Sequence, residues 1–148
     1  MDLKRPSIAL ASDHAGYFLK EIIKGFLIKN GHEVKDYGTD SEERADYADH
    51  VHPLASALEA GQHERGIVIC GSGNGVNITA NKYQGVRSAL SWTPEIARLG
   101  RAHNDANVLA LPARFIDEVT ALECVLLFLS TPFEGGRHAE RVQKIRIK

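Results

Sequence analysis

The sequence predicts an α/β fold: a single Rossmann-like, doubly wound domain in which flanking helices cover a five-stranded parallel sheet. The first observation behind this prediction is that short apolar runs alternate with longer segments of helical periodicity, a pattern typical of parallel strands joined by crossover helices. The second is the length of 148 residues, which suits one domain with one compact core. Because no internal repeat, low-complexity tract or linker interrupts the sequence, we expect residues 1–148 to form one domain.

Each predicted strand is a short apolar run. The five runs are SIALAS (residues 7–12), residues 33–36, GIVIC (66–70), RSALS (87–91) and NVLAL (107–111). In an open sheet of this kind, ligands bind beyond the carboxyl ends of the strands, where the strand order reverses. In the flavodoxin-like order this point lies between the first and third strands, which are followed here by SDHAG (12–16) and CGSGNG (70–75). We therefore expect these two turns to meet in one crevice.

The first predicted helix follows the first strand and carries apolar residues at i, i+4 spacing, which are expected to face the sheet. These residues are Phe18, Ile22 and Phe26, with Leu19, Ile23 and Leu27 beside them. Gly31 is expected to end this helix. Further helices are predicted over residues 47–60, with a break or a start near Pro53, over residues 118–130, and from about 136 to 147.

The composition argues against polyanionic and membrane partners. Hydrophobic residues make up 43% and charged residues 25% of the chain, and the formal net charge is −1, so no strong field favours nucleic acid or a membrane surface. The opening residues MDLKRPSIALAS are interpreted as leading into the first strand rather than as a signal peptide, and no segment has the apolar length of a membrane span. Cys70 and Cys124 need not pair in a chain that buries its own core, which favours the reducing cytoplasm.

The loop VICGSGNGV (residues 68–76) carries glycines at alternate positions. This G-x-G-x-G spacing lacks the third glycine position of the dinucleotide fingerprint, and Ser91 and Trp92 stand where an acidic ribose-binding residue is expected. The loop also has no Lys-Ser pair of a P-loop. We therefore interpret it as an oxyanion hole, whose backbone amides point at an anion near the start of a helix, rather than as a nucleotide cradle.

Cys70 ends the third predicted strand and approaches a helix N-terminus, where amides and the helix dipole lower the pKa of a thiol. Its turn also holds the Ser72 hydroxyl. The alternative is a small buried hydrophobe, which is the usual state of a free cysteine and fits Cys124 inside CVLLFL. We expect Cys70 to be reactive and Cys124 to be packed.

Several polar residues are candidate partners of this thiol. Asp13 and His14 leave the first strand just before a helix, where an aspartate also commonly serves as a cap. His103 lies in RAHNDAN between a helix and the last strand, followed by Asn104 and Asp105; a surface histidine is the alternative. A metal site from Asp13, His14, His103 and Asp105 is disfavoured, because no H-x-x-x-H or C-x-x-C spacing supports it.

Arg137 and Arg141 are four residues apart and project from one face of the terminal predicted helix. Two guanidinium groups on one face form a good phosphate fork, whereas the alternative is a solvated basic tail. Arg114, just after the fifth predicted strand, is a third candidate of the same kind.

Four stretches, ASDHAG, ICGSGNGVNITANK, HNDANVLAL and EGGRHAERV, together resemble the sugar-phosphate isomerase family of type B ribose-5-phosphate isomerase, which includes galactose-6-phosphate and allose-6-phosphate isomerases. The resemblance runs from about residue 8 to residue 141. It implies a cytoplasmic, Rossmann-like homodimer or homotetramer with sites at the subunit interface, and no metal or organic cofactor. It further implies aldose-ketose isomerisation in carbohydrate metabolism, with ribose 5-phosphate and ribulose 5-phosphate of the pentose phosphate pathway as the expected pair.

By position, the resemblance makes Cys70 the base and makes Asp13 and His103 the ring-opening pair, with Ser72 assisting through its hydroxyl. It implies enediolate and substrate binding by the remaining positions, which are Gly71, Gly73, Asn74 and Gly75 of the loop, the hydroxyl ligand Asn104, and the phosphate ligands His14, Arg114, Arg137 and Arg141. Asn74 and Asn77 replace small or apolar residues of many members, Ala48 stands where a proline is frequent, and Val76 stands where cysteine-lacking members carry a glutamate.

Three alternatives stay open on the sequence. The substrate could be a hexose 6-phosphate, either allose or galactose phosphate, because sequence does not give pocket depth. The chain could be a subunit that needs a second chain type for turnover. It could also be a cysteine hydrolase with Cys70 as nucleophile, His103 as base and Asp13 as the orienting group.

Overall fold

The computed structural model describes residues 5–148, so the first four residues of the predicted start lie outside the described part. Five strands form one parallel sheet: β1 (Ile8–Ser12), β2 (Val34–Asp36), β3 (Arg65–Cys70), β4 (Ser88–Leu90) and β5 (Val108–Pro112). Their order across the sheet is β2-β1-β3-β5-β4. All five predicted strands are confirmed, because short apolar runs between helical segments suit strands that are covered on both faces.

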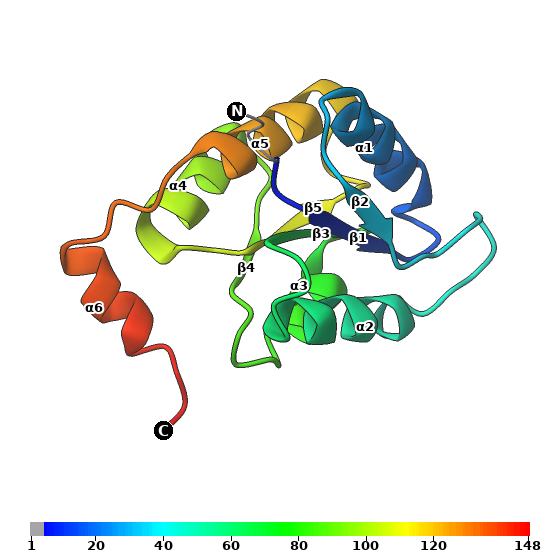
Figure 1. Cartoon of the computed structure of the whole chain (residues 1–148). Helices are drawn as coiled ribbons and strands as arrows, with labels where there is room; N and C mark the ends of the chain where they lie inside the picture. Colours follow the sequence, from blue (N-terminus) through cyan, green and yellow to red (C-terminus); the bar gives the residue numbers. More distant parts are fainter. Residues whose placement is uncertain (1–4) are drawn as a thin grey trace.

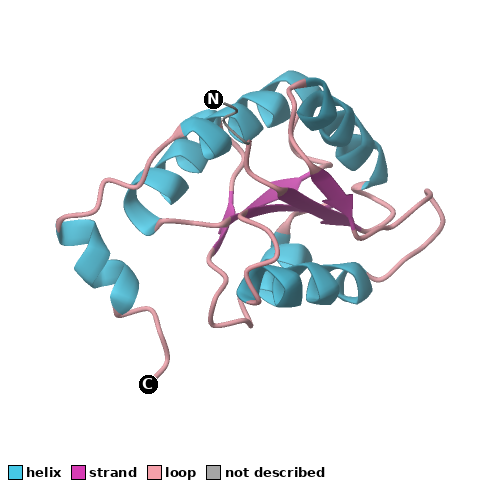
Figure 2. Ribbon diagram, viewed as in Figure 1, coloured by secondary structure: helices cyan, strands magenta, loops and turns pink. Residues whose placement is uncertain are grey.

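Six helices complete the described chain: α1 (Tyr17–Lys29), α2 (Tyr47–Glu59), α3 (Asn74–Ala80), α4 (Pro94–Asn104), α5 (Glu118–Ser130) and α6 (Arg137–Gln143). Helices α1, α4 and α5 cover one face of the sheet and α2 and α3 the other, as Figures 1 and 2 show. The predicted doubly wound domain is therefore confirmed. Helix α6 lies beyond α4 and projects away from the sheet (Figure 1).

The strand order places the reversal point between β1 and β3, as expected, because β2 lies on the far side of β1. The other half of the sheet departs from the flavodoxin-like order, since β5 pairs with β3 and β4 occupies the edge. The central strands β1 and β5 are buried along their whole length. They give the crevice at their carboxyl ends a rigid floor.

Helix α1 buries one row of its predicted apolar stripe and exposes the other. Leu19, Ile23 and Leu27 are buried in the core, whereas the side chains of Phe18 and Ile22 are 59% and 37% exposed. The expectation that Phe18 and Ile22 face the sheet is wrong, because adjacent i, i+4 rows on a helix diverge and only one of them meets the strands. The helix ends at Lys29, with Gly31 at a φ of +84°, so the predicted ending is confirmed.

Helix α2 runs through Pro53 without the predicted break. A proline lacks the amide that would bond to the carbonyl of Asp49, but both residues lie on the exposed side of the helix, where water can satisfy that carbonyl. The last helix is shorter than predicted and ends at Gln143, since residues 144–148 are exposed and pack no apolar face.

The two cysteines are free and lie on opposite faces of the sheet. Cys70 packs in the cluster under α2 and α3, and Cys124 packs in the cluster under α1, α4 and α5. Burial raises the pKa of the Cys124 thiol to about 11, which fits the prediction of a packed residue. Across residues 5–148, none of the helices has the length and apolar character needed to cross a bilayer.

Candidate active site

A cavity of about 490 Å³ opens at the carboxyl ends of β1 and β3. Its wall includes predicted site residues from both turns and from the end of β5, namely Asp13, His14, Cys70, Gly71, Ser72, Gly75 and Arg114. The prediction that the two turns meet in one crevice is confirmed. An adjoining hollow of about 300 Å³, lined in part by Asn74 and Trp92, shares Ser72 and Phe115 with this cavity.

Cys70 is the last residue of β3 and forms part of the cavity wall. Only 4% of the residue is exposed. Its carbonyl accepts a hydrogen bond of 2.9 Å from the amide of Ala113, which ties the end of β3 to the segment that follows β5. The thiol therefore sits at a fixed point of the sheet edge, partly withdrawn from water, as a positioned acid-base group requires.

The glycine loop brings other side chains close to its backbone. A Cβ at Gly71 would lie 3.2 Å from Cδ of Arg114, and a Cβ at Gly75 would lie 2.5 Å from the ring of Tyr47. Gly73, at a φ of +78°, turns the chain into α3. Ser72 Oγ accepts a hydrogen bond of 3.2 Å from the amide of Asn74, which leaves its hydroxyl hydrogen free to donate.

Asp13 lines the cavity and also orders the turn before α1. Its Oδ1 accepts a hydrogen bond of 3.1 Å from the amide of Gly16, so the alternative role as a helix-start cap is partly correct. Gly16 has no room for a side chain, because a Cβ there would lie 2.5 Å from the carbonyl oxygen of Ile69. The contact with β3 holds the Asp13 carboxylate beside the loop that follows Cys70.

His14 and Arg114 bring cationic or hydrogen-bonding groups to the same crevice. Nδ1 of His14 lies 3.2 Å from the amide nitrogen and 3.3 Å from the carbonyl oxygen of Ala45, so the backbone of Ala45 holds this side of the ring and Nε2 remains for other partners. The amide of Arg114 donates to the carbonyl of Gly71 at 2.9 Å, which fixes the backbone of this arginine against the loop. Both residues are suitably placed for an anionic group of a ligand.

The remaining predicted site residues lie near the amino ends of the strands, at the opposite end of the sheet from Cys70. Helix α4 begins at the carboxyl ends of the strands, where β4 ends, and runs back to their amino ends, where β5 begins. His103 and Asn104 are the last two residues of this helix. Cys70 pairs with Pro112 at the other end of β5, four residues beyond Val108. At about 3.3 Å per residue, the length of β5 separates the Cys70 end of the sheet from the His103 end by about 13 Å. One chain therefore does not bring His103, Asn104, Arg137 and Arg141 to Cys70.

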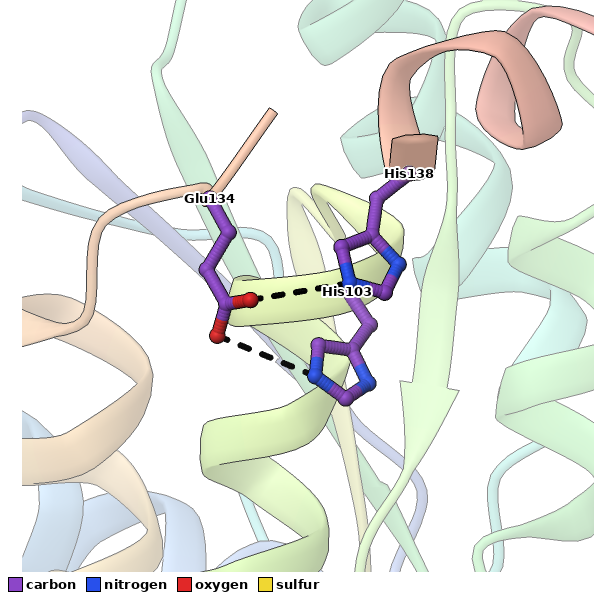
Figure 3. A group of neighbouring side chains, drawn as sticks. All are labelled: His103, Glu134 and His138. Atoms are coloured by element: carbon purple, nitrogen blue, oxygen red, sulfur yellow. Dashed lines mark ion pairs between the residues drawn. The ribbon is translucent and has the colours of Figure 1, made fainter. Parts of the chain in front are cut away.

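At this second position His103 is grouped with Glu134 and His138 (Figure 3). The imidazole centroids are 4.2 Å apart and the rings are nearly parallel, at 10°. Desolvation, together with the neighbouring His103 and Arg137, lowers the pKa of His138. Asp105 is engaged elsewhere, because its Oδ1 accepts a hydrogen bond of 2.7 Å from Arg101. The disfavoured metal combination with Asp13 and His14 does not form within the chain.

The chain is similar to known proteins along nearly its whole length. Residues 8–145 match the family described as Ribose/Galactose Isomerase. This chain belongs to that family. It is 43% identical over 138 residues to ribose-5-phosphate isomerase B of Escherichia coli K12, with 93% of each chain covered.

Solved structures agree with this membership of the ribose/galactose isomerase family. A ribose 5-phosphate isomerase from Thermotoga maritima matches with a TM-score of 0.93 at 48% identity, over 95% of this chain and 97% of the other. Ribose-5-phosphate isomerase B from Mycoplasma genitalium, solved with bound ribulose-5-phosphate, matches with a TM-score of 0.90 at 40% identity, over 94% and 93% of the two chains. The sequence motifs thus identified the family correctly.

Four residues of this ribose/galactose isomerase were not predicted as site residues. Tyr47 and Phe115 line the cavity at Cys70, and Glu134 and His138 surround His103. No pattern marks the first two, since an aromatic residue at a helix start or in a turn has no signature of its own. No pattern marks Glu134 and His138 either, because Glu134 precedes α6 and is separated from it by Gly135 and Gly136, both at positive φ.

Proposed function

We propose that this chain is a cofactor-independent aldose-ketose isomerase that interconverts ribose 5-phosphate and ribulose 5-phosphate. The observation that carries the proposal is the Cys70 thiol in the cavity wall where the strand order reverses, next to a loop of backbone amides. Aldose-ketose conversion needs a base next to a carbonyl, donors for a developing enediolate and a site for phosphate. The crevice offers candidates for each part.

In the proposed reaction, Cys70 as the thiolate removes the proton from C2 of the open-chain aldose and returns it to C1. Amides of the loop from Gly71 to Gly75 and the hydroxyl of Ser72 stabilise the negative oxygen of the enediolate. The C2 hydroxyl loses its proton and O1 gains one, so a ketone at C2 and a hydroxyl at C1 result. The low exposure of Cys70 limits the access of water to the thiol.

The cyclic sugar must open before this step. We assign ring opening to Asp13, which takes the proton of the C1 hydroxyl, and to His103, which protonates the ring oxygen as its bond to C1 breaks. Because His103 lies at the far end of β5, we propose that a second copy of the chain supplies it, in a homodimer or a homotetramer built from such dimers. A twofold axis would then create two equivalent sites.

The same arrangement divides the phosphate ligands. His14 and Arg114 come from the copy that supplies Cys70, whereas Arg137 and Arg141 come with His103 and Asn104 from the other copy. Both arginines on α6 are exposed and α6 projects from its own domain, which supports a role beside a neighbouring chain (Figure 1). The site needs Cys70 as a free thiol, so a reducing cytoplasm is the compartment that suits it.

The alternatives differ in what they require. A cysteine hydrolase needs Cys70 and His103 within hydrogen-bond reach of each other, which a second copy of the chain would have to provide, because one chain keeps them at opposite ends of β5. Hexose 6-phosphates share the reaction and differ by one carbon, so they remain a second candidate class of substrate. A requirement for a second chain type would appear as an inactive purified chain.

The deciding experiment assays the purified single chain against ribose, allose and galactose phosphates in deuterated water. We expect the highest turnover with ribose 5-phosphate and solvent deuterium at C1 of the ribulose 5-phosphate formed. Faster turnover of a hexose 6-phosphate would change the substrate. A covalent acyl adduct on Cys70 with an ester substrate, without deuterium incorporation, would support the hydrolase instead.

Arg137→Ala and Arg141→Ala are expected to raise KM for ribose 5-phosphate with a smaller change in kcat. Loss of one charged phosphate contact weakens binding by about 1.5 to 3 kcal/mol, which corresponds to about a 10- to 100-fold rise in KM. Lys144→Ala, which removes another exposed cation at the end of α6, serves as the control with an unchanged KM. An unchanged KM in both arginine variants would remove them from the site.

His103→Asn is expected to slow the reaction of ribose 5-phosphate more than that of ribulose 5-phosphate. Ribose 5-phosphate is mainly cyclic, whereas ribulose 5-phosphate is acyclic because its 5-oxygen carries the phosphate. Deuterium exchange at C1 of ribulose 5-phosphate therefore reports proton transfer at carbon without ring opening. Loss of an acid-base group at the ring-opening step should lower forward turnover by about 10²-fold. Equal losses in the two assays would assign His103 to the isomerisation step.

A further inference from the structure

The carboxylate of Glu134 faces two stacked imidazoles at once (Figure 3). Its Oε2 lies 3.7 Å from Nε2 of His103, and its Oε1 lies 3.5 Å from Nε2 of His138. Both rings therefore turn the same nitrogen toward one acidic group. The Nδ1 atom of each ring is the nitrogen that remains for other partners.

The position of Glu134 is built by the backbone. Its amide donates a hydrogen bond of 3.0 Å to the carbonyl of Ala102, the residue before His103. Nε of the buried Arg101 donates to the carbonyl of Thr131 at 3.3 Å, so the segment before α6 is fastened to the end of α4 at two points. Gly135, at a φ of +69°, then turns the chain so that His138 stacks on His103.

A metal ion is the rival interpretation of two histidines and a glutamate. Zinc binds imidazole nitrogen at about 2.0 to 2.1 Å, along the lone pair in the plane of the ring. Two stacked rings at 10° direct their Nε2 lone pairs along nearly parallel planes, so the lone pairs do not converge on one ion. Arg137 adjoins His138 and adds positive charge. The arrangement favours pairing of the carboxylate with the imidazoles over coordination.

We propose that Glu134 is a positioning residue that holds the Nε2–H of His103 and thereby presents Nδ1 of His103 to the sugar ring. This inference rests on the proposed function, in which His103 assists ring opening. During opening, Nδ1–H of the imidazolium protonates the ring oxygen, the bond from that oxygen to C1 breaks, and Asp13 takes the C1 hydroxyl proton. An aldehyde and a free hydroxyl result, and the nearby carboxylate stabilises the imidazolium before transfer.

His138 has a separate part in this arrangement. Its ring is buried and lies flat against His103, which restricts the plane that the His103 ring can adopt. Desolvation and the neighbouring His103 and Arg137 lower the pKa of His138, which disfavours its charged form. The negative charge of Glu134 is then available to the His103 imidazolium.

Glu134→Gln tests the inference, because a glutamine keeps the shape but loses the charge and offers an amide N–H to one of the rings. We expect kcat for ribose 5-phosphate to fall about 10- to 100-fold, while deuterium exchange at C1 of ribulose 5-phosphate stays within about twofold. Glu134→Asp keeps the charge and should restore part of the loss. Glu140→Gln, which changes an exposed glutamate on α6, is the matched control and should leave both rates unchanged.

Two rates decide the inference: the turnover of ribose 5-phosphate and the deuterium exchange at C1 of ribulose 5-phosphate. If they move together in Glu134→Gln, whether both fall or neither changes, Glu134 does not act on ring opening and the inference is overturned. Stoichiometric Zn²⁺ binding to the wild-type chain that Glu134→Gln abolishes also overturns it. A wild-type chain that does not isomerise ribose 5-phosphate contradicts the proposed function instead of the role of Glu134.

Discussion

Cys70→Ala is expected to lower kcat for ribose 5-phosphate by about 10²- to 10⁴-fold, the usual contribution of a positioned acid-base group. The thiolate is proposed as the only base that moves the proton between C1 and C2, and Val76 offers no carboxylate in the loop as a substitute. Substrate binding should persist, because the proposed phosphate ligands come from other elements. The measurement is kcat per folded site, together with the thermal midpoint of the variant.

Cys124→Ala is the matched control for this experiment. Cys124 is fully buried in the opposite cluster, so loss of its sulfur should leave a cavity and lower the free energy of unfolding by about 1 to 2 kcal/mol. Its kcat per folded site should remain close to that of the wild type. A Cys70→Ala chain that melts early and still turns over normally would return Cys70 to the role of a packed residue.

Mixing two inactive variants is expected to restore activity. If one copy supplies Cys70 and the other His103, a dimer of one Cys70→Ala chain and one His103→Asn chain contains one site with both native residues. Random pairing of equal amounts makes half of the dimers mixed, and each has one intact site of two. The rate should therefore reach about a quarter of the wild-type value.

The control for this mixture is a chain that carries both substitutions, combined with either single variant. Such mixtures contain no site with both native residues, so they should stay at the level of the variants alone. The single variants are unfolded together and refolded together, which allows chains to exchange. If the mixed single variants show only the sum of their separate rates, the proposed sharing of the site between two copies is wrong.

Strand positions were predictable from the sequence because both faces of the sheet are covered. A strand buried on two faces is a continuous apolar run, and GIVIC and NVLAL are such runs. The exposed row of α1 was not predictable, since Phe18 and Ile22 are as apolar as the buried row and only the packed sheet distinguishes the two. The exchange of β4 and β5 was also not predictable, because the crossover helices permit either order.

The place of the candidate site in the fold was predictable from the sequence, and its geometry was less so. The crevice at β1 and β3 followed from the rule for open sheets, and the structure places Asp13, His14, Cys70 and Arg114 there. The distance of His103 from Cys70 follows from chain direction, because a helix that joins two parallel strands ends at the amino edge of the sheet. The contact between His103 and Glu134 depends on the turn at Gly135, which residue types alone do not specify.

Because His103 and Cys70 lie at opposite ends of β5, the proposed activity depends on the association of two chains and therefore on the chain concentration. Each chain buries its own two core clusters, so we expect it to keep its fold alone, but a single copy holds only half of the proposed machinery. Below the dissociation constant of the pair, the rate should rise with the square of the chain concentration. Dilution would then abolish turnover and leave the circular dichroism spectrum unchanged, so a modest change in expression would alter flux more than proportionally.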